Sequence, residues 1–346
     1  MKKNTEILKL KKQLKEKILS PMYIFYGEED FLKELYVKRV TAAVPDGGFP
    51  EFNHIKLEGS DVSFSDYDDA WEGFPMMTDK RLIHIKDSGI FSAAKKNGTG
   101  PSSEEKKAFW LEKFKRLSDD TVVIFDEKNI DKRSAVYKAA TKVGEAVEFS
   151  YLSDADLVTW VIKQCLDTKK KISKENAYYL ITLCDPGLNN INNELKKLLD
   201  FCGDEIYKSD IDRVVSKSMQ VITFDLTNAI MVGNANKAMA VLYDLQTAKE
   251  SAFGILYLML SSLEKILRVK LMANSSKNEI ASALGMAPFI AQKYIESSEG
   301  FDEESLVWMI RRVAEIDMEI KEGRIDETTA LEQYIAQCVY KSQRRV

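Results

Sequence analysis

The stretch Pro21-Met-Tyr-Ile-Phe-Tyr26, followed by Gly27-Glu-Glu-Asp30, decides the fold of this chain. The apolar residues before the glycine are typical of a buried strand, and a helical segment begins at Phe31. At such a strand-to-helix turn, phosphate-binding proteins carry G-x-x-x-x-G-K-[ST], whose backbone N–H groups surround the phosphates. Here the turn carries acidic residues, one glycine and no Lys-Ser or Lys-Thr pair. The sequence therefore predicts the frame of a nucleotide site without its phosphate loop.

A later strand supplies the other half of such a frame. Thr121-Val-Val-Ile-Phe125 is apolar and ends in Asp126-Glu127, as the metal-binding half of an ATPase site would. Mg²⁺ in these sites shares its coordination with substrate phosphates. Because the phosphate loop is missing, we interpret Asp126 and Glu127 as a polar strand end rather than as a metal ligand and a general base. We expect no cofactor, no metal and no catalytic residue.

The composition is that of an ordinary globular protein. The chain has 346 residues, a formal net charge of −4, 45% hydrophobic residues and 30% charged residues. This length allows two or three domains, and the acidic balance argues against a dedicated nucleic-acid binder. The four cysteines are widely spaced, which favours reduced thiols over a zinc or redox site. Neither a secretory signal nor a membrane span is predicted, so the expected location is the cytoplasm.

Strand and helix signals alternate over residues 1–149, which predicts a parallel sheet flanked by helices. The predicted strands are 22–26, 52–57, 81–86, 121–125 and 146–149, and the predicted helices are 31–43, 64–73, 103–117 and 132–142. Composition predicts a flexible loop over 95–103. The strand signal ends after residue 151. Residues 150–218, with helix-capping residues at Ser153 and Ser173, form a predicted small helical domain, and residues 219–346 a predicted helical bundle.

Several motifs occur in a characteristic order along almost the whole chain. They are Tyr23-Ile-Phe-Tyr-Gly-Glu-Glu29, Lys128-Asn-Ile-Asp-Lys-Arg133, Leu188-Asn-Asn-Ile-Asn-Asn-Glu-Leu195, Phe224-Asp-Leu-Thr-Asn-Ala-Ile230 and Asp317-Met-Glu-Ile-Lys321. In order and spacing they resemble the delta subunit of the bacterial DNA polymerase III clamp loader. The resemblance implies a multidomain fold: an AAA+-like (RecA-like) α/β domain lacking a P-loop, a helical lid and a helical collar for oligomerisation.

The resemblance also implies a function without intrinsic catalysis. The family's delta subunit binds and opens the sliding clamp (beta), so that the clamp can be loaded on primed DNA during replication. The implied partners are the clamp, the ATPase (tau/gamma) and delta-prime subunits, and primer-template DNA within the assembled complex. An enzyme class, if assigned, would describe the DNA-directed DNA polymerase holoenzyme.

The family binds the clamp through two large apolar side chains ahead of the third strand, which here implies Phe74, Pro75, Met76 and Met77. Gly73 and Pro75 end the preceding helix and lift these side chains away from regular packing. Methionine is unbranched and polarizable, so it can fill an irregular apolar pocket. The family more often has Leu-Phe or Phe-Phe here, and Met-Met is a departure. The alternative is that these residues are core residues at a helix end.

Other functions remain open at this stage. A divergent ATPase would use Asp126 and Glu127, and another subunit of the same loader would need a full phosphate loop or a zinc-type cysteine cluster, which the sequence lacks. The basic clusters 9–17, 169–171 and 341–345 are either solvated faces or contacts with DNA phosphates. His54 and His84 lie on predicted strands without a catalytic partner nearby in sequence, so we expect structural roles.

Overall fold

The structure is a computed structural model that describes residues 2–59, 62–92, 103–286 and 288–343. The chain divides into two compact units, Met1–Tyr151 and Leu152–Val346. The predicted division of the second unit at residue 218 into lid and collar stays a prediction. Residues 95–102 of the predicted flexible loop lie outside the described residues.

A five-stranded parallel sheet forms the centre of the first unit, in the order β2-β3-β4-β1-β5. Its strands are β1 Met22–Tyr26, β2 His54–Glu58, β3 Arg81–Lys86, β4 Thr121–Glu127 and β5 Glu145–Glu148. All residues of β1 and β4 are buried, as expected for central strands of a sheet covered on both faces. The strands of the two halves of the predicted nucleotide frame, β1 and β4, are therefore neighbours.

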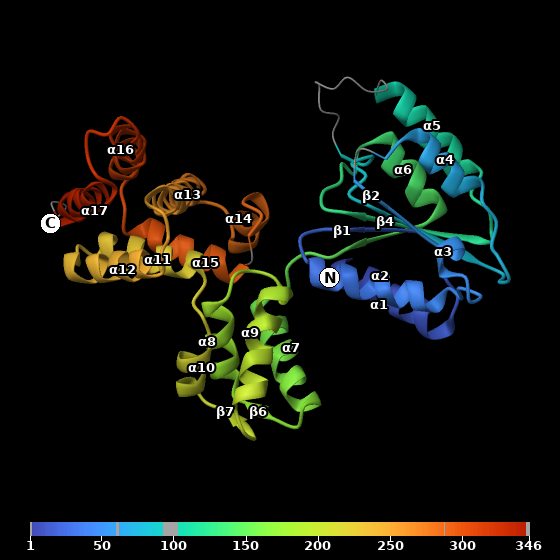
Figure 1. Ribbon diagram of the computed structural model, residues 1–346, viewed down its shortest axis with the longest axis horizontal. Helices are drawn as coiled ribbons and strands as arrows, with labels where there is room; N and C mark the ends of the chain where they lie inside the picture. Colours follow the sequence, from blue (N-terminus) through green and yellow to red (C-terminus); the bar gives the residue numbers. More distant parts are fainter. Residues whose placement is uncertain (1, 60–61, 93–102, 287, 344–346) are drawn as a thin grey trace. The chain divides into compact units, whose positions relative to one another are not determined.

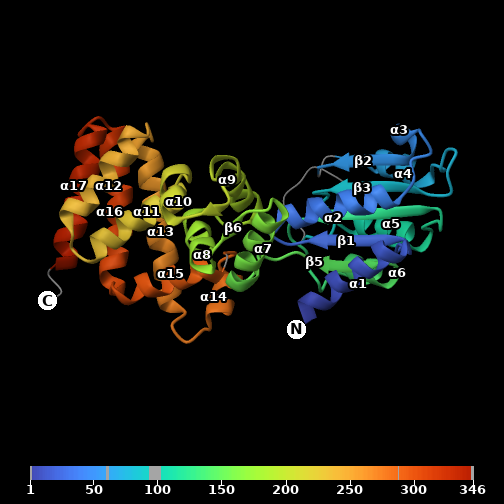
Figure 2. The same ribbon diagram turned by 90° about the horizontal axis from the view of Figure 1, so that it is seen from below.

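Helices cover both faces of this sheet, as Figures 1 and 2 show. The helices of the first unit are α1 Lys2–Glu16, α2 Asp30–Ala43, α3 Pro50–Asn53, α4 Phe64–Glu72, α5 Ser103–Lys115 and α6 Ala135–Val143. Helices α1 and α2 pack on one face, and α4, α5 and α6 pack on the other. The first unit is thus a three-layer α/β/α domain.

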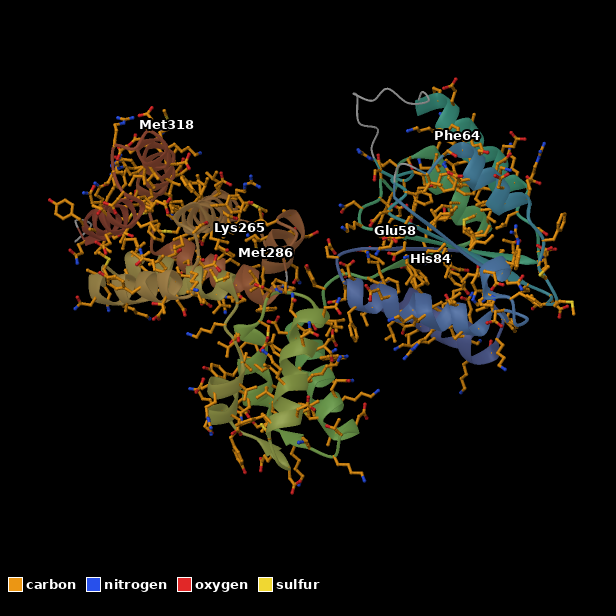
Figure 3. All side chains as sticks on the ribbon, viewed as in Figure 1. Glu58, Phe64, His84, Lys265, Met286 and Met318 are labelled. Atoms are coloured by element: carbon orange, nitrogen blue, oxygen red, sulfur yellow. The ribbon has the colours of Figure 1, made fainter. Side chains whose placement is uncertain are left out.

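Two apolar clusters hold the layers together, one on each face of the sheet. Ile24 and Phe125 face α4, α5 and α6, where they meet Trp71 and Trp110. The alternating residues of the same strands, such as Phe25, pack with α1 and α2 on the opposite face. At the outer end of the first cluster Phe64, labelled in Figure 3, stacks on Phe109 with ring centroids 4.7 Å apart. Successive residues of β1 and β4 thus belong to clusters on opposite faces of the sheet, although all of them are buried.

The second unit is almost entirely helical. Its helices are α7 Asp154–Asp167, α8 Lys174–Leu183, α9 Leu188–Phe201, α10 Lys208–Val214, α11 Met219–Met231, α12 Ala235–Thr247, α13 Ala252–Leu271, α14 Lys277–Ala283, α15 Pro288–Glu299, α16 Glu303–Lys321 and α17 Glu327–Gln343. Serine caps set many of the helix starts: the hydroxyl of Ser153 accepts from the N–H of Asp156, and that of Ser173 from the N–H of Asn176. Long helices α13 and α16 pack together, and the buried hydroxyl of Tyr334 donates to the carbonyl of Met309 at 3.1 Å.

Two sequence expectations were wrong in detail. Strand signals do not end at residue 151, because β6 Lys171–Ile172 and β7 Glu205–Ile206 form a short parallel pair. Two-residue strands have no periodicity that a sequence could reveal. The predicted strand 52–57 starts later, at His54, since Pro50 opens the short helix α3.

Among the described residues, the structure contains no helix that is long and apolar enough to cross a membrane.

Candidate functional site

The predicted nucleotide frame lies where β1 and β4 end side by side. The helices that follow these strands, α2 and α6, cover opposite faces of the sheet, and ligands of open α/β sheets bind at such switch points. Gly27 makes the turn out of β1 with φ +116°, and a Cβ there would collide with the backbone of Phe149. The turn thus requires glycine for its own geometry, independently of any phosphate.

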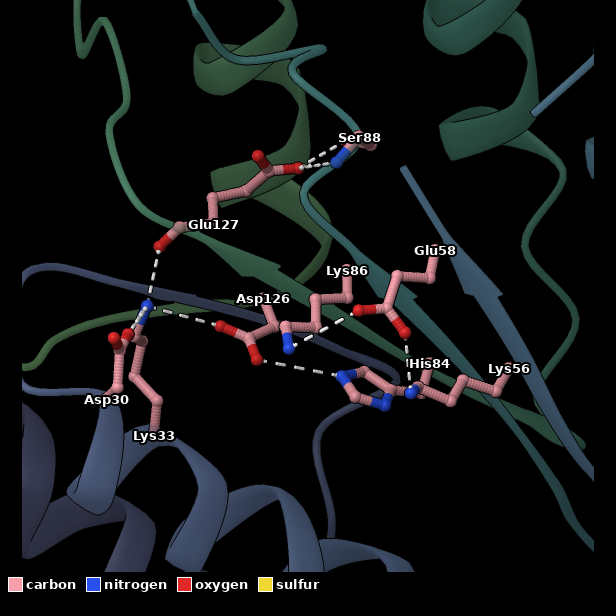
Figure 4. Close-up of polar contacts among 9 residues, drawn as sticks. All are labelled: Asp30, Lys33, Lys56, Glu58, His84, Lys86, Ser88, Asp126 and Glu127. Atoms are coloured by element: carbon pink, nitrogen blue, oxygen red, sulfur yellow. Dashed lines mark hydrogen bonds and ion pairs between the residues drawn. The ribbon is translucent and has the colours of Figure 1, made fainter. Parts of the chain in front are cut away.

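A lysine that the sequence analysis missed occupies this frame. Lys33 Nζ lies 2.9 Å from Asp30 Oδ1 and 3.4 Å from Asp126 Oδ1, and it donates to the carbonyl of Glu127 at 3.2 Å (Figure 4). The side chains of Lys33 and Asp126 are only 3% and 6% exposed. The ammonium is therefore neutralised from within the protein, where a phosphate loop would offer its lysine to a nucleotide.

The spacing of the chain could have revealed this residue. Lys33 stands six positions after Gly27, as the lysine of G-x-x-x-x-G-K does, although Leu32 and Glu34 replace the second glycine and the hydroxyl residue. No Lys-Ser or Lys-Thr pair is present, but a lysine does stand at the position that the motif gives to its lysine. In this structure its ammonium contacts the carboxylates of Asp30 and Asp126.

The two carboxylates at the end of β4 lie in different environments. Asp126 Oδ2 is 3.8 Å from His84 Nε2, and its other oxygen faces Lys33. Burial alone would raise the pKa of Asp126, but His84 and Lys33 more than offset it and hold the pKa below its ordinary value. Burial raises the pKa of Glu127, which accepts hydrogen bonds from the hydroxyl and N–H of Ser88 and from the N–H of Gly89.

Asp126 and Glu127 therefore point to separate partners, as Figure 4 shows, and do not converge on one point as a metal ligand and a general base would. Within the described part of the chain, no group of three or more His, Cys, Asp or Glu side chains is placed to hold a metal ion. The acidic neighbour of His84 is Asp126, which the sequence analysis did not predict. His54 contacts the carbonyl of Val44 through Nε2 at 2.9 Å, which fits a structural role.

The segment Phe74–Met77 lies between α4 and β3. Helix α4 starts with a capping box between Ser63 and Asp66 and ends at Glu72, and the next residues are not helical. The side chains of Phe74, Met76 and Met77 are 83%, 41% and 81% exposed, and Pro75 is half-buried. The alternative that these are core residues is wrong for Phe74 and Met77. Large apolar side chains this exposed in one short segment mark a candidate interaction site.

A buried arginine anchors the start of this segment. Arg81 donates through Nη2 to the carbonyl of Trp71 at 2.7 Å and through Nε to the hydroxyl of Thr121 at 3.2 Å. Its guanidinium also fills the space beside Gly73, where a Cβ would lie 2.6 Å from Nη1. Burial lowers the pKa of Arg81 despite the nearby carboxylates. Arg81 thereby fixes the end of α4 to the sheet. The sequence analysis did not predict this role, because Arg81 is the first residue of a strand.

The three basic clusters have unequal surroundings. Lys9 pairs with Glu145, and Lys170 donates to the carbonyl of Cys202. Lys341 lies over the ring of Trp308, with Nζ 5.1 Å from its centroid. Arg344 and Arg345 lie outside the described residues. These contacts do not single out one cluster as a DNA-binding surface.

Comparisons with known proteins agree with the fold and with one another. The family "DNA polymerase III, delta subunit" matches residues 23–151, and the family "DNA polymerase III delta subunit, C-terminal domain" matches residues 220–338. DNA polymerase III subunit delta of Bacillus subtilis (strain 168) is 27% identical over 343 residues, which are 96% of this chain and 97% of that protein. A solved structure of the Bacillus subtilis DNA clamp loader delta protein aligns with a TM-score of 0.71 at 25% identity, over 96% of this chain and 99% of that one.

The chain has a parallel α/β unit followed by a helical unit, and it aligns along almost its whole length with a clamp-loader protein. These observations define the class of this protein as an AAA+-like clamp-loader subunit. The predicted fold class is thereby confirmed. Within this class, the chain belongs to the family of DNA polymerase III delta subunits.

Proposed function

We propose that this protein binds the sliding clamp (beta) through Phe74, Pro75, Met76 and Met77 and favours the open state of the clamp, so that the ring can be loaded on primed DNA. The observation that carries the proposal is the exposure of Phe74 and Met77 on a segment whose start is fixed by a buried arginine. Burying one such side chain in a partner's pocket stabilises a complex by about 1.5–3 kcal/mol. Binding opens the ring by no more than the difference in affinity for its open and closed states.

The proposed division of labour leaves ATP hydrolysis to other subunits. In this chain the lysine of the frame is paired with Asp126 and Asp30, and the acidic residues Glu28 and Glu29 stand at the turn where a polyphosphate would bring further negative charge. Repulsion between these charges and a triphosphate disfavours nucleotide binding. A protein of this kind acts by binding, without chemistry of its own.

The proposed partners are the ATPase (tau/gamma) and delta-prime subunits, which the predicted collar, residues 219–346, contacts in a cytoplasmic loader. Helix α13 supports this role, because it buries Leu256 and Leu263 while leaving Tyr257 and Leu271 exposed. Primer-template DNA is the proposed partner of the assembled complex, where basic clusters reach the phosphates with salt-dependent affinity.

The test is binding of the purified protein to the sliding clamp of the same organism, without nucleotide, by surface plasmon resonance. A Met76→Ala/Met77→Ala variant removes both thioethers, and we expect binding at least about a hundredfold weaker. Leu8→Ala/Ile18→Ala is the matched control, since these apolar side chains are also exposed and belong to the same unit. The control is expected to bind like wild type.

Equal binding by wild type and the methionine variant would refute the proposed site. Absence of binding by folded wild-type protein would refute the clamp-binding function and point to another subunit of the loader. Opening is measured separately, with a donor and an acceptor fluorophore placed across the ring interface of the clamp. A titration with ATP decides the ATPase alternative, because saturable binding would contradict the proposed division of labour.

A further inference from the structure

The buried amide of Asn53 holds the backbone of the exposed segment. Asn53 is the last residue of α3, and its side chain is fully buried. Nδ2 donates to the carbonyls of Asp46 and Met76, both at 2.8 Å, and Oδ1 accepts from the N–H of Met76 at 2.7 Å. One amide thus binds both backbone polar groups of Met76. The two carbonyls need the NH₂ group and the N–H needs the oxygen, so the partners fix the orientation of the amide.

A second contact holds the next residue. Gly47 adopts φ +61°, and a Cβ there would lie 2.8 Å and 2.9 Å from the carbonyl oxygens of Met76 and Met77. The two turns therefore meet backbone to backbone. Met77 itself has φ +57°, a left-handed conformation that is rare for a residue with a side chain and that persists where neighbouring structure imposes it.

These contacts hold the backbone of the segment without using its apolar side chains. Phe74 and Met77 are almost fully exposed, so their own packing does little to hold the backbone. The backbone is instead held by Asn53 and by the close approach at Gly47, while the methionine side chains stay available to a partner. A surface already in its bound shape loses less conformational entropy when it binds.

We propose that Asn53 is a positioning residue for clamp binding: it presets the backbone of Met76 and Met77 so that the free protein already presents both thioethers in the binding-competent shape. This inference rests on the proposed function, and it adds a residue that has no direct contact with the clamp. If only a fraction of molecules hold this shape, the apparent affinity falls by that fraction. The loss then appears in the association rate, whereas loss of an anchoring side chain raises the dissociation rate.

The variants Asn53→Asp and Gly47→Ala test this role from two sides. Asn53→Asp keeps the shape but turns carboxylate oxygens toward the carbonyls of Asp46 and Met76. Gly47→Ala leaves Asn53 intact and forces the two turns apart. We expect each to raise the Kd for the organism's sliding clamp about tenfold to hundredfold, mainly through slower association. Met77→Ala is the comparison in which dissociation becomes faster.

A second readout needs no clamp. Hydrogen exchange measured on the full chain should show faster exchange of the Met76 amide in Asn53→Asp and Gly47→Ala than in wild type, because Asn53 Oδ1 accepts from this N–H. Val123→Ala is the stability control: it removes buried volume in β4 away from the segment and should change neither the association rate nor the exchange of Met76.

Unchanged association and unchanged Met76 exchange in both variants would overturn the inference. So would an effect no larger than that of Val123→Ala, since it would reflect general loss of stability. If Asn53→Asp does not fold, Gly47→Ala decides alone. The proposed function fails separately, when Met76→Ala/Met77→Ala binds the clamp as wild type does. Loss of binding in that variant, together with wild-type association in both Asn53→Asp and Gly47→Ala, refutes only the role of Asn53.

Discussion

Replacement of Lys33 by methionine removes the ammonium that closes the nucleotide frame. Methionine keeps most of the apolar stem but leaves the Asp126 carboxylate buried without the cation 3.4 Å away. Removing one partner of a buried ion pair costs about 3–5 kcal/mol. We therefore expect Lys33→Met to lower the free energy of unfolding by about 3–5 kcal/mol at pH 7. Asp30 is half exposed and loses its partner at little cost.

The pH dependence of this loss has a definite sign. In wild type the pKa of Asp126 lies below its ordinary value, so its contribution to stability is present above about pH 4 and is lost as the pH falls through the folded-state pKa. Lys33 is one of the two residues that lower this pKa, so we expect a higher pKa for Asp126 in the variant. Protonation of the carboxylate then begins at a higher pH in the variant than in wild type. The difference between wild type and variant should therefore shrink from pH 7 to about pH 4.

Urea unfolding followed by tryptophan fluorescence measures both effects. In a Trp160→Phe/Trp308→Phe background, the remaining Trp71 and Trp110 lie in the core of the first unit, so the signal reports this unit alone. Lys33→Met/Asp126→Asn is the matched control, which removes both charges and should recover at least half of the lost free energy. A Lys33→Met variant within about 0.5 kcal/mol of wild type, or a loss independent of pH, would refute the assigned ion pair.

Three further predictions concern the scaffold. Gly27→Ala should lower the free energy of unfolding by about 1–3 kcal/mol more than Gly48→Ala does. Both glycines have positive φ, but only at Gly27 would a Cβ meet neighbouring backbone. Equal losses in thermal unfolding would contradict this. Arg81→Lys keeps the charge but cannot bond both Trp71 and Thr121, so we expect a loss of about 1–3 kcal/mol in urea unfolding, and a variant as stable as wild type would argue against the anchor. Burial raises the pKa of Cys165 to about 11 and of Cys184 and Cys338 to about 12, and it also raises that of Cys202. Iodoacetamide at pH 8 should therefore modify these thiols only after unfolding, as mass spectrometry can show, and rapid labelling of folded protein would refute their assigned burial.

The elements that the sequence predicted well are those with local signals. Ser153 and Ser173 mark the starts of α7 and α8 because a serine hydroxyl caps the N–H three residues on, a contact within one turn. Strands β1 and β4 can be predicted from their short apolar runs, because both faces of the sheet are covered and all their residues are buried. Neither signal depends on the distant parts of the chain.

The candidate site was predicted less completely, because the contacts that hold it join residues that are far apart in the sequence. Lys33 and Asp126 are far apart in sequence and meet only through the pairing of β1 with β4. Asn53 falls in what the sequence indicates as a strand, and only the fold turns its amide to Met76. Whether Phe74 and Met77 are exposed could not be decided from the residues, since a helix end can pack against a core or leave it. Exposure is settled by the structure, and clamp binding stays a proposal.

The strand order of the first unit has a consequence for how the protein is made. Strand β1 leaves the ribosome well before both of its neighbours, because β4 and β5 lie about a hundred or more residues further along the chain. The apolar residues of β1 therefore have no strand partner until β4, which ends at Glu127, has emerged, several seconds or more later at about 5–20 residues per second. The second partner, β5, follows at Glu145–Glu148. The helices of the second unit, in contrast, make mostly local contacts, which form fast. We therefore expect the parallel sheet to complete its folding later than the helices do, and the first unit, which carries the nucleotide frame and the exposed segment, to expose unpaired apolar strands for longer during synthesis.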